Sequence, residues 1–184
     1  MRRQQVIMAL LGLVFPFCTC LLADEIYIPA DWQIFKDKAY GYQLHYPPTW
    51  KVTNRAKRKQ MIRGGLTSKD GKSGFQIRAY QKRCPFKRFV KSYLKRFKSD
   101  MSKHWKGTFT AETISYEKIG KHQGCVIELG FQRGDGRAYH FMEFLWHNED
   151  RVVAFQCGTP MSTKDEMSAL LYSIAETFSF VERS

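Results

Sequence analysis

The segment Arg137–His147, with the sequence RAYHFMEFLWH, decides which fold this chain is expected to adopt. In a β-strand, successive side chains point to opposite faces. One face of this strand would carry Met142, Phe144 and Trp146, and the other Tyr139, Phe141 and Leu145. A strand that is apolar on both faces is expected to lie inside a sheet that is covered on both sides.

Two neighbouring segments predict that this strand is the middle of an antiparallel meander. Gly124–Gln132 precedes it and Arg151–Cys157 follows it, and both are rich in apolar residues. Short polar connections separate the three segments, RGDG at 133–136 and NED at 148–150. Such connections are typical of β-hairpins. Three consecutive strands are therefore expected to lie side by side.

The first of these turns sets the expected register. If Gln132 and Arg137 flank the turn, Ile127 lies opposite Met142. Residues that face each other across a ladder point to the same side of the sheet. The face of Met142 would then also carry Cys125, Ile127 and Leu129.

Two amphipathic helices are available to cover the two faces of the sheet. Residues 86–104 carry apolar side chains three and four positions apart, and Pro85 stands where a helix can begin. Residues 163–177 are expected to form the second helix, whose apolar face would carry Met167, Leu170, Leu171 and Ile174. Together these patterns predict an α/β fold, a three-layer α/β/α sandwich around a mainly antiparallel central sheet.

The remaining strands are expected on either side of the first helix. Trp32–Phe35 and Gly41–Tyr46 can pair as a hairpin, which Pro47 and Pro48 would end. Three further segments read as extended: a weak strand at 61–67, a clearer one at 74–81 and a third at 109–119.

The N-terminus is typical of a secretory signal peptide. Arg2 and Arg3 precede an apolar run at 6–17, and a small residue, Ala23, comes before two acids. The run is too short for the roughly 20 residues that cross a bilayer. We expect cleavage after Ala23, a short mobile lead-in at 24–31, and one domain at 32–184 with no transmembrane span. The protein would be exported, periplasmic or extracellular; an uncleaved anchor or a buried helix is the alternative.

Positive charge is concentrated in one part of the chain. Without residues 1–23, the chain has 28 Lys and Arg against 17 Asp and Glu, a charge of +11. Residues 51–106 alone carry +17, whereas 24–50 carry −2 and 107–184 carry −4. Charge asymmetry of this kind bears on association rather than on fold.

One motif resembles a known family. The stretch 40–50, YGYQLHYPPTW, is similar to the opening strand of PsbP-like domains, which ends in Tyr-Pro with a Trp nearby. The order of elements over 32–181 and the closing Ser179-Phe180 pair are also similar. This resemblance to the PsbP-like family, including its DcrB-like bacterial branch, implies an exported αβα sandwich used for docking or assembly. It brings no catalytic residues with it.

These observations favour a non-enzymatic exported binding or assembly module with a basic surface within 51–106. Its expected partner is an anionic envelope component: a lipid headgroup, an acidic glycan or an acidic protein. The candidate binding residues are Arg55, Lys57, Arg58, Lys59, Lys87, Arg88, Lys91, Lys95, Arg96 and Lys98. The alternative is a solvated polar face without a ligand.

Nucleic acid and a membrane-lying helix are less favoured. Tyr80, Phe86 and Phe89 intersperse the cations, as base stacking would require. However, Phe86 and Phe89 belong to the apolar stripe of the first helix, which the sheet needs for cover.

The second hypothesis is a small exported enzyme that uses Cys84 or a His-bearing sheet face. Cys84 follows two cations and precedes a helix, an environment that favours the thiolate. His140 and His147 lie on the central strand. The histidines lack the spacing of metal ligands on a helix, so neither a metal nor a cofactor is expected.

Three cysteines remain after the signal peptide, an odd number. In the predicted meander, the strands of Cys125 and Cys157 are separated by a third strand. At about 4.8 Å per strand, their Cα atoms would be roughly 9.6 Å apart, beyond the ~7 Å that a disulfide spans. We therefore predict that Cys125 and Cys157 are not bonded to each other.

Overall fold

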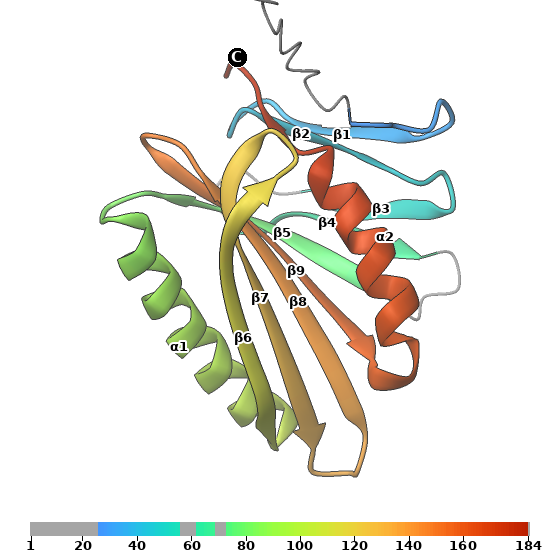
Figure 1. Cartoon of the computed structure of the whole chain (residues 1–184), viewed down its shortest axis with the longest axis vertical. Helices are drawn as coiled ribbons and strands as arrows, with labels where there is room; N and C mark the ends of the chain where they lie inside the picture. Colours follow the sequence, from blue (N-terminus) through green and yellow to red (C-terminus); the bar gives the residue numbers. More distant parts are fainter. Residues whose placement is uncertain (1–25, 56–61, 69–72, 184) are drawn as a thin grey trace, which may run out of the picture.

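A computed structural model describes residues 26–55, 62–68 and 73–183 of the chain (Figure 1). It has two helices, α1 (Phe86–Trp105) and α2 (Lys164–Glu176), with a 3-10 turn at Met161–Thr163. The first five strands are β1 (Gln33–Asp37), β2 (Tyr42–Tyr46), β3 (Trp50–Arg55), β4 (Ile62–Ser68) and β5 (Gly74–Gln81). The others are β6 (Gly107–Ile119), β7 (His122–Arg133), β8 (Ala138–His147), β9 (Arg151–Pro160) and β10 (Ser179–Phe180).

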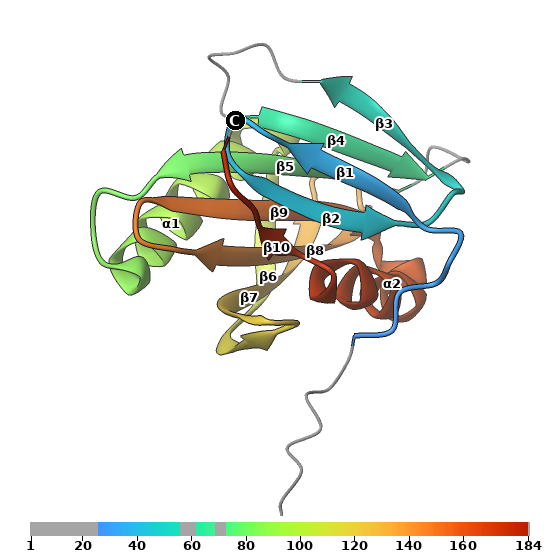
Figure 2. The same cartoon turned by 90° about the horizontal axis from the view of Figure 1, so that it is seen from above.

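The strands form two antiparallel sheets. The large sheet has the order β3-β4-β5-β9-β8-β7-β6, and the small one has the order β1-β2-β10. The meander β7-β8-β9 is as predicted, as is the hairpin β1-β2. In Figure 2, which looks at the molecule from above, the small sheet is nearest the viewer. The described segments at 50–55 and 62–68 extend the large sheet beyond β5; the sequence patterns had not indicated β3.

Helix α1 covers one face of the large sheet. Its buried side chains are Val90, Tyr93, Leu94 and Phe97, which pack against apolar residues of β7, β8 and β9. Pro85 stands at its N-cap, and the left-handed Lys106 ends it, with φ of 47°. Burial of this stripe, as its periodicity predicted, leaves the basic side chains of the helix to project outward.

The opposite face of the large sheet is covered by α2 together with the small sheet. Trp146 of β8 stacks on Phe178, with ring centroids 4.3 Å apart. Tyr42 and Leu44 of β2 belong to the same buried cluster. The predicted three-layer α/β sandwich is therefore confirmed, and the third layer consists of a helix and a second sheet.

The register predicted for β7 and β8 was wrong by one residue. Arg133 and Arg137 close the turn, since the Arg133 N–H donates to the Arg137 carbonyl at 2.8 Å. The turn is therefore three residues long, and Gly136 takes the positive φ of 87° that such a turn needs. Ile127 consequently pairs with Glu143 instead of Met142.

A one-residue shift exchanges the two faces of a strand. The alternate residues Cys125, Ile127 and Leu129 therefore face α1, and Val126 joins Met142 and Phe144 on the α2 side. Because β8 is apolar on both faces, the sandwich forms with either assignment.

Candidate binding surface

A row of lysines runs along one flank of α1. Lys87, Lys91, Lys95 and Lys98 are spaced four, four and three residues apart, so they share one side of the helix. The first three are exposed, and Lys98 is half-buried. We call these four residues the lysine row. Burial of Val90 and Leu94 against the sheet holds the row at the surface next to β6.

The strand β6 forms the other wall of a groove beside the lysine row. Its alternate residues Glu112, Ile114 and Tyr116 point to the α1 face, because they pair with Leu129, Ile127 and Cys125 of β7. Since β6 is the last strand of the sheet, the side chains of Ile114 and Tyr116 stay 39% and 45% exposed. The resulting α1–β6 groove has a volume of about 620 Å³.

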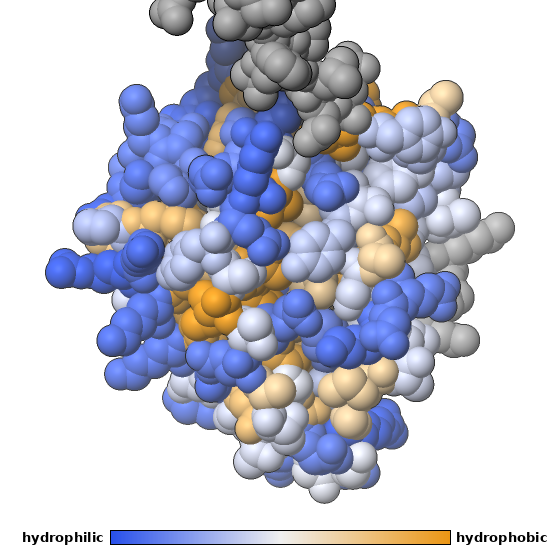
Figure 3. All heavy atoms as spheres, viewed as in Figure 1, coloured by the Kyte–Doolittle hydropathy of each residue, from blue (hydrophilic) through white to orange (hydrophobic). Residues whose placement is uncertain are grey.

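The groove has an apolar floor with charged side chains along it. Val90, Leu94, Ile114 and Tyr116 supply the apolar lining. Figure 3 shows this hydrophobic patch between α1 and β6, with hydrophilic side chains on the α1 side. A surface of this composition suits a partner that has both apolar and negatively charged groups.

Contacts within the protein hold the two ends of the lysine row. At one end, Lys98 Nζ lies 2.6 Å from Glu112 Oε2 and 5.2 Å from the centre of the Phe109 ring. At the other end, Lys87 Nζ lies 5.4 Å from the centre of the Tyr116 ring. In the middle, Lys91 and Lys95 have no ion pair within the described parts of the chain.

The structure separates the residues that the sequence predicted as one basic surface. The lysine row lies together on the groove. Arg96 lines a pocket on the other flank of α1, and Arg88 is exposed. Arg55 belongs to β3, at the edge of the sheet opposite β6. Lys57, Arg58 and Lys59 lie outside the described residues. The groove residues of β6 were missed, although the alternation of Glu112, Ile114 and Tyr116 was visible in the sequence.

A second pocket, of about 240 Å³, lies on the β5 side of α1. Arg78, Tyr93 and Gln156 line it. Glu143, on the α1-facing side of β8, is completely buried nearby, and its carboxylate oxygens have no hydrogen bond among the described residues. Burial raises the pKa of Glu143 from 4.5 to about 7, and the Tyr93 hydroxyl and Arg78 oppose this change. The sequence signal for this group was one acid inside an apolar strand.

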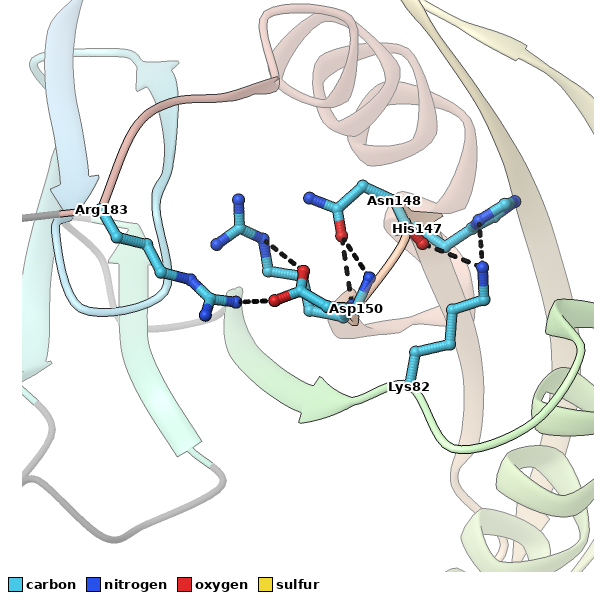
Figure 4. Close-up of polar contacts among 6 residues, drawn as sticks. Lys82, His147, Asn148, Asp150 and Arg183 are labelled. Atoms are coloured by element: carbon cyan, nitrogen blue, oxygen red, sulfur yellow. Dashed lines mark hydrogen bonds and ion pairs between the residues drawn. The ribbon is translucent and has the colours of Figure 1, made fainter.

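A third polar cluster connects the β8–β9 turn to its surroundings (Figure 4). Lys82 Nζ donates to the Asn148 carbonyl at 2.9 Å and lies 3.4 Å from His147 Nδ1. Asn148 Oδ1 accepts the backbone N–H groups of Asp150 and Arg151 at 3.2 and 3.1 Å. Asp150 forms an ion pair with Arg183 at 2.5 Å. These contacts join the turn to β5 and to the C-terminal segment, which is a structural role.

Two of the groups proposed for catalysis, Cys84 and His140, lie on different faces of the large sheet. Cys84 lines the 240 Å³ pocket on the β5 side of α1, and the residues lining that pocket include no histidine. His140 lies on the α2 side, where its Nε2 is 3.2 Å from Glu128 Oε2. Burial lowers the pKa of His140, an effect that outweighs the opposing hydrogen bond that the imidazole donates to the Glu128 carboxylate. Within the described residues, no three His, Cys, Asp or Glu side chains are grouped to hold a metal ion.

Comparison with known proteins gives structural neighbours. No family model and no curated protein sequence matches the chain. Cyanobacterial PsbP (CyanoP) from Synechocystis sp. PCC 6803 has a TM-score of 0.65 at 14% identity, covering 85% of this chain and 95% of its own. LpqN, involved in cell envelope biogenesis of Mycobacterium tuberculosis, has a TM-score of 0.52 at 12% identity, covering 82% and 91%.

A further neighbour is the Ran-binding protein Mog1p of Saccharomyces cerevisiae. Its TM-score is 0.56 at 9% identity, covering 83% of this chain and 96% of its own. At these identities the likeness shows the fold, which is PsbP-like, as the motif at 40–50 predicted. Neither helix in the described part of the chain is both long and apolar enough to cross a membrane.

Proposed function

We propose that this chain, which has the PsbP-like fold, is an exported, non-enzymatic binding module that docks onto an anionic partner through the α1–β6 groove. The observation that carries the proposal is the lysine row beside an apolar floor. The signal-like N-terminus supports export. The partner is an anionic component of the cell envelope or of the space outside it.

The packing of α1 determines where its charged side chains lie. The helix must bury its apolar stripe, and this places three exposed amines next to one another along the groove. Like charges that are held together repel one another, and an anionic partner relieves that repulsion. The nearby apolar side chains of Leu94 and Ile114 add a contact that salt does not screen.

The separation of Cys84 from His140 supports binding over catalysis by that pair. A thiol nucleophile needs a base within hydrogen-bond reach. Cys84 and His140 lie on opposite sides of the large sheet, and the His140–Glu128 pair packs on the side of α2. His147 is on the α1 side, where its ring contacts Phe86 and Lys82.

The test measures retention of the protein on immobilised polyglutamate, on heparin and on phosphatidylglycerol vesicles at 0.01 and 0.15 M salt. We expect retention on at least one of these anions at low salt, with marked weakening at higher salt. The Debye length falls from about 30 Å to about 8 Å between the two conditions. Changing Lys87, Lys91 and Lys95 to Glu is expected to abolish retention; Lys98 is kept because it pairs with Glu112.

A matched control makes the same change in net charge at positions outside the groove. Lys36 and Lys38 in and beside β1, and Lys121 in the β6–β7 turn, are exposed and away from the groove. The variant with these three changed to Glu should keep most of its retention. If both triple variants lose retention equally, net charge and not the groove is responsible, and the proposal is wrong.

A further inference from the structure

The outer edge of β6 is available for pairing. β6 pairs with β7 along one edge, from Gly107 opposite Arg133 to Ile119 opposite His122. Along its other edge, no strand of the described residues pairs with it. An unpaired edge presents a row of backbone N–H and C=O groups, which is a template for another strand.

Few of the features that usually block an edge strand are present in β6. Residues 108–119 contain neither proline nor glycine, and Thr, Ile and Tyr at 113, 114 and 116 favour strands. The one irregularity of register lies between Phe109 and Ala111, near the start of the strand. From Glu112 onward the pairing with β7 is regular, so the free edge there is also regular.

The lysine row lies beside this regular part of the edge. Figure 1 shows α1 and β6 running alongside each other. The contacts of Lys98 with Glu112 and of Lys87 with Tyr116 show that the two elements run in opposite directions. Lys91 and Lys95 therefore lie between these fixed ends, next to Ile114.

The spacing of the lysines matches that of an added strand. Four residues of an α-helix advance about 6 Å, which is the step from Lys87 to Lys91 and from Lys91 to Lys95. Two residues of a strand advance about 6.8 Å, the step between side chains on one face. The two repeats differ by less than about 1 Å per step. Alternate side chains of an added strand can therefore meet successive lysines.

We infer that an extended, acidic segment of a partner protein adds to the free edge of β6 as a further strand, with acidic side chains at alternate positions facing the lysine row. Backbone hydrogen bonds to β6 would supply affinity, and the lysines would select acidic residues at every second position. This inference rests on the proposed function and names the kind of anionic partner that the groove accepts.

The experiment uses an eight-residue peptide of alternating Glu and Val, labelled for fluorescence anisotropy. Its controls are an isomer with four Glu followed by four Val, and two alternating peptides that are N-methylated on all Glu or on all Val residues. A strand pairs through one edge, where every second residue presents its N–H. We expect the block isomer and one N-methylated peptide to bind at least tenfold more weakly, and the other N-methylated peptide to retain more binding.

Two protein variants and one exchange measurement locate the site. Changing Lys91 and Lys95 to Gln is expected to weaken the binding of the alternating peptide at least tenfold. The matched change of Lys36 and Lys38 to Gln should leave this binding unchanged. Bound peptide should slow hydrogen exchange of amides within 112–118. The Gln variants keep exposed positions polar, and circular dichroism checks that they fold.

The possible failures can be told apart. If the alternating, block and N-methylated peptides all bind equally but lose affinity in the Lys91 and Lys95 variant, charge alone drives docking. The strand inference is then overturned and the proposed function stands. The same holds if phosphatidylglycerol vesicles bind and the peptides do not. If no polyanion binds in a lysine-dependent way, both are wrong.

Discussion

Glu143 is a charged residue type at a completely buried position, on the same face of the sheet as Tyr93 and Arg78. Removing a carboxylate from water disfavours its charged form, and this raises its pKa to about 7. Such a group binds a proton in the folded protein at pH values where the unfolded chain has released it. The residue therefore links folding to pH.

Glu143 contributes stability that is fully present below its ordinary pKa of 4.5 and is lost as the pH rises to about 7. The variant Glu143→Gln cannot ionise at this position. We predict that, between pH 4.5 and pH 8, the free energy of unfolding of the variant rises by about 3 kcal/mol relative to that of the wild type. Urea unfolding across this range provides the measurement.

The control for this prediction is the exposed Glu149→Gln, which should follow the wild type at every pH. Buried histidines such as His140, whose pKa is lowered, contribute in the opposite direction, since their stability contribution grows as the pH rises. For that reason the difference between variant and wild type is the quantity to compare. A difference that does not change with pH would contradict the assignment.

At the scale of elements, the order of the strands decides which residues can meet. β8 lies between β7 and β9, as the turns in the sequence predicted. Cys125 belongs to the buried cluster under α1, and Cys157 to the cluster on the other face. Burial raises the pKa of each thiol to about 12, which suppresses the reactive thiolate.

Cys125 and Cys157 are therefore kept from forming a disulfide with each other for two reasons. A central strand separates them, and their side chains point to opposite sides of the sheet. We expect non-reducing peptide mapping to recover Cys125 and Cys157 in separate peptides, each labelled by iodoacetamide only after denaturation. Recovery of a peptide that joins the two would mean that the strand order is wrong.

At the scale of the whole molecule, the two helices and the small sheet cover both faces of the large sheet but leave β6 at its edge. The proposed binding groove is a consequence of this incomplete cover. α1 lies along β6 closely enough to form one wall of the groove, and no strand of the described residues pairs with the outer edge of β6.

Export is also a property of the whole chain. We predict that the exported protein begins at Asp24, because cleavage after Ala23 follows a basic and then an apolar segment. N-terminal sequencing of protein recovered from outside the cytoplasm is the measurement, and Ala23→Arg should block processing at this bond. An exported protein that retains Met1 would contradict the prediction.

The sequence by itself determined both helices, the meander and the cover on both faces of the large sheet, but neither β3 nor the second sheet. Apolar residues with a period near 3.6 mark α1, and a strand apolar on both faces requires cover on both sides, so these features follow from local pattern and burial. The register of β7 and β8 did not follow, because one residue fewer in the turn that ends at Gly136 exchanges the faces without changing the pattern of either strand.

Only the tertiary structure decided where the candidate site is. Charge counting could group Arg55, Arg96 and Lys91. However, Arg55 belongs to a strand at the far edge of the sheet, and Arg96 and Lys91 lie on opposite flanks of α1. Likewise, Ile114 and Tyr116 read as ordinary strand residues until β6 is known to be the last strand. Neighbour relations between distant segments depend on how the sheet is ordered, and local periodicity carries no information about that order.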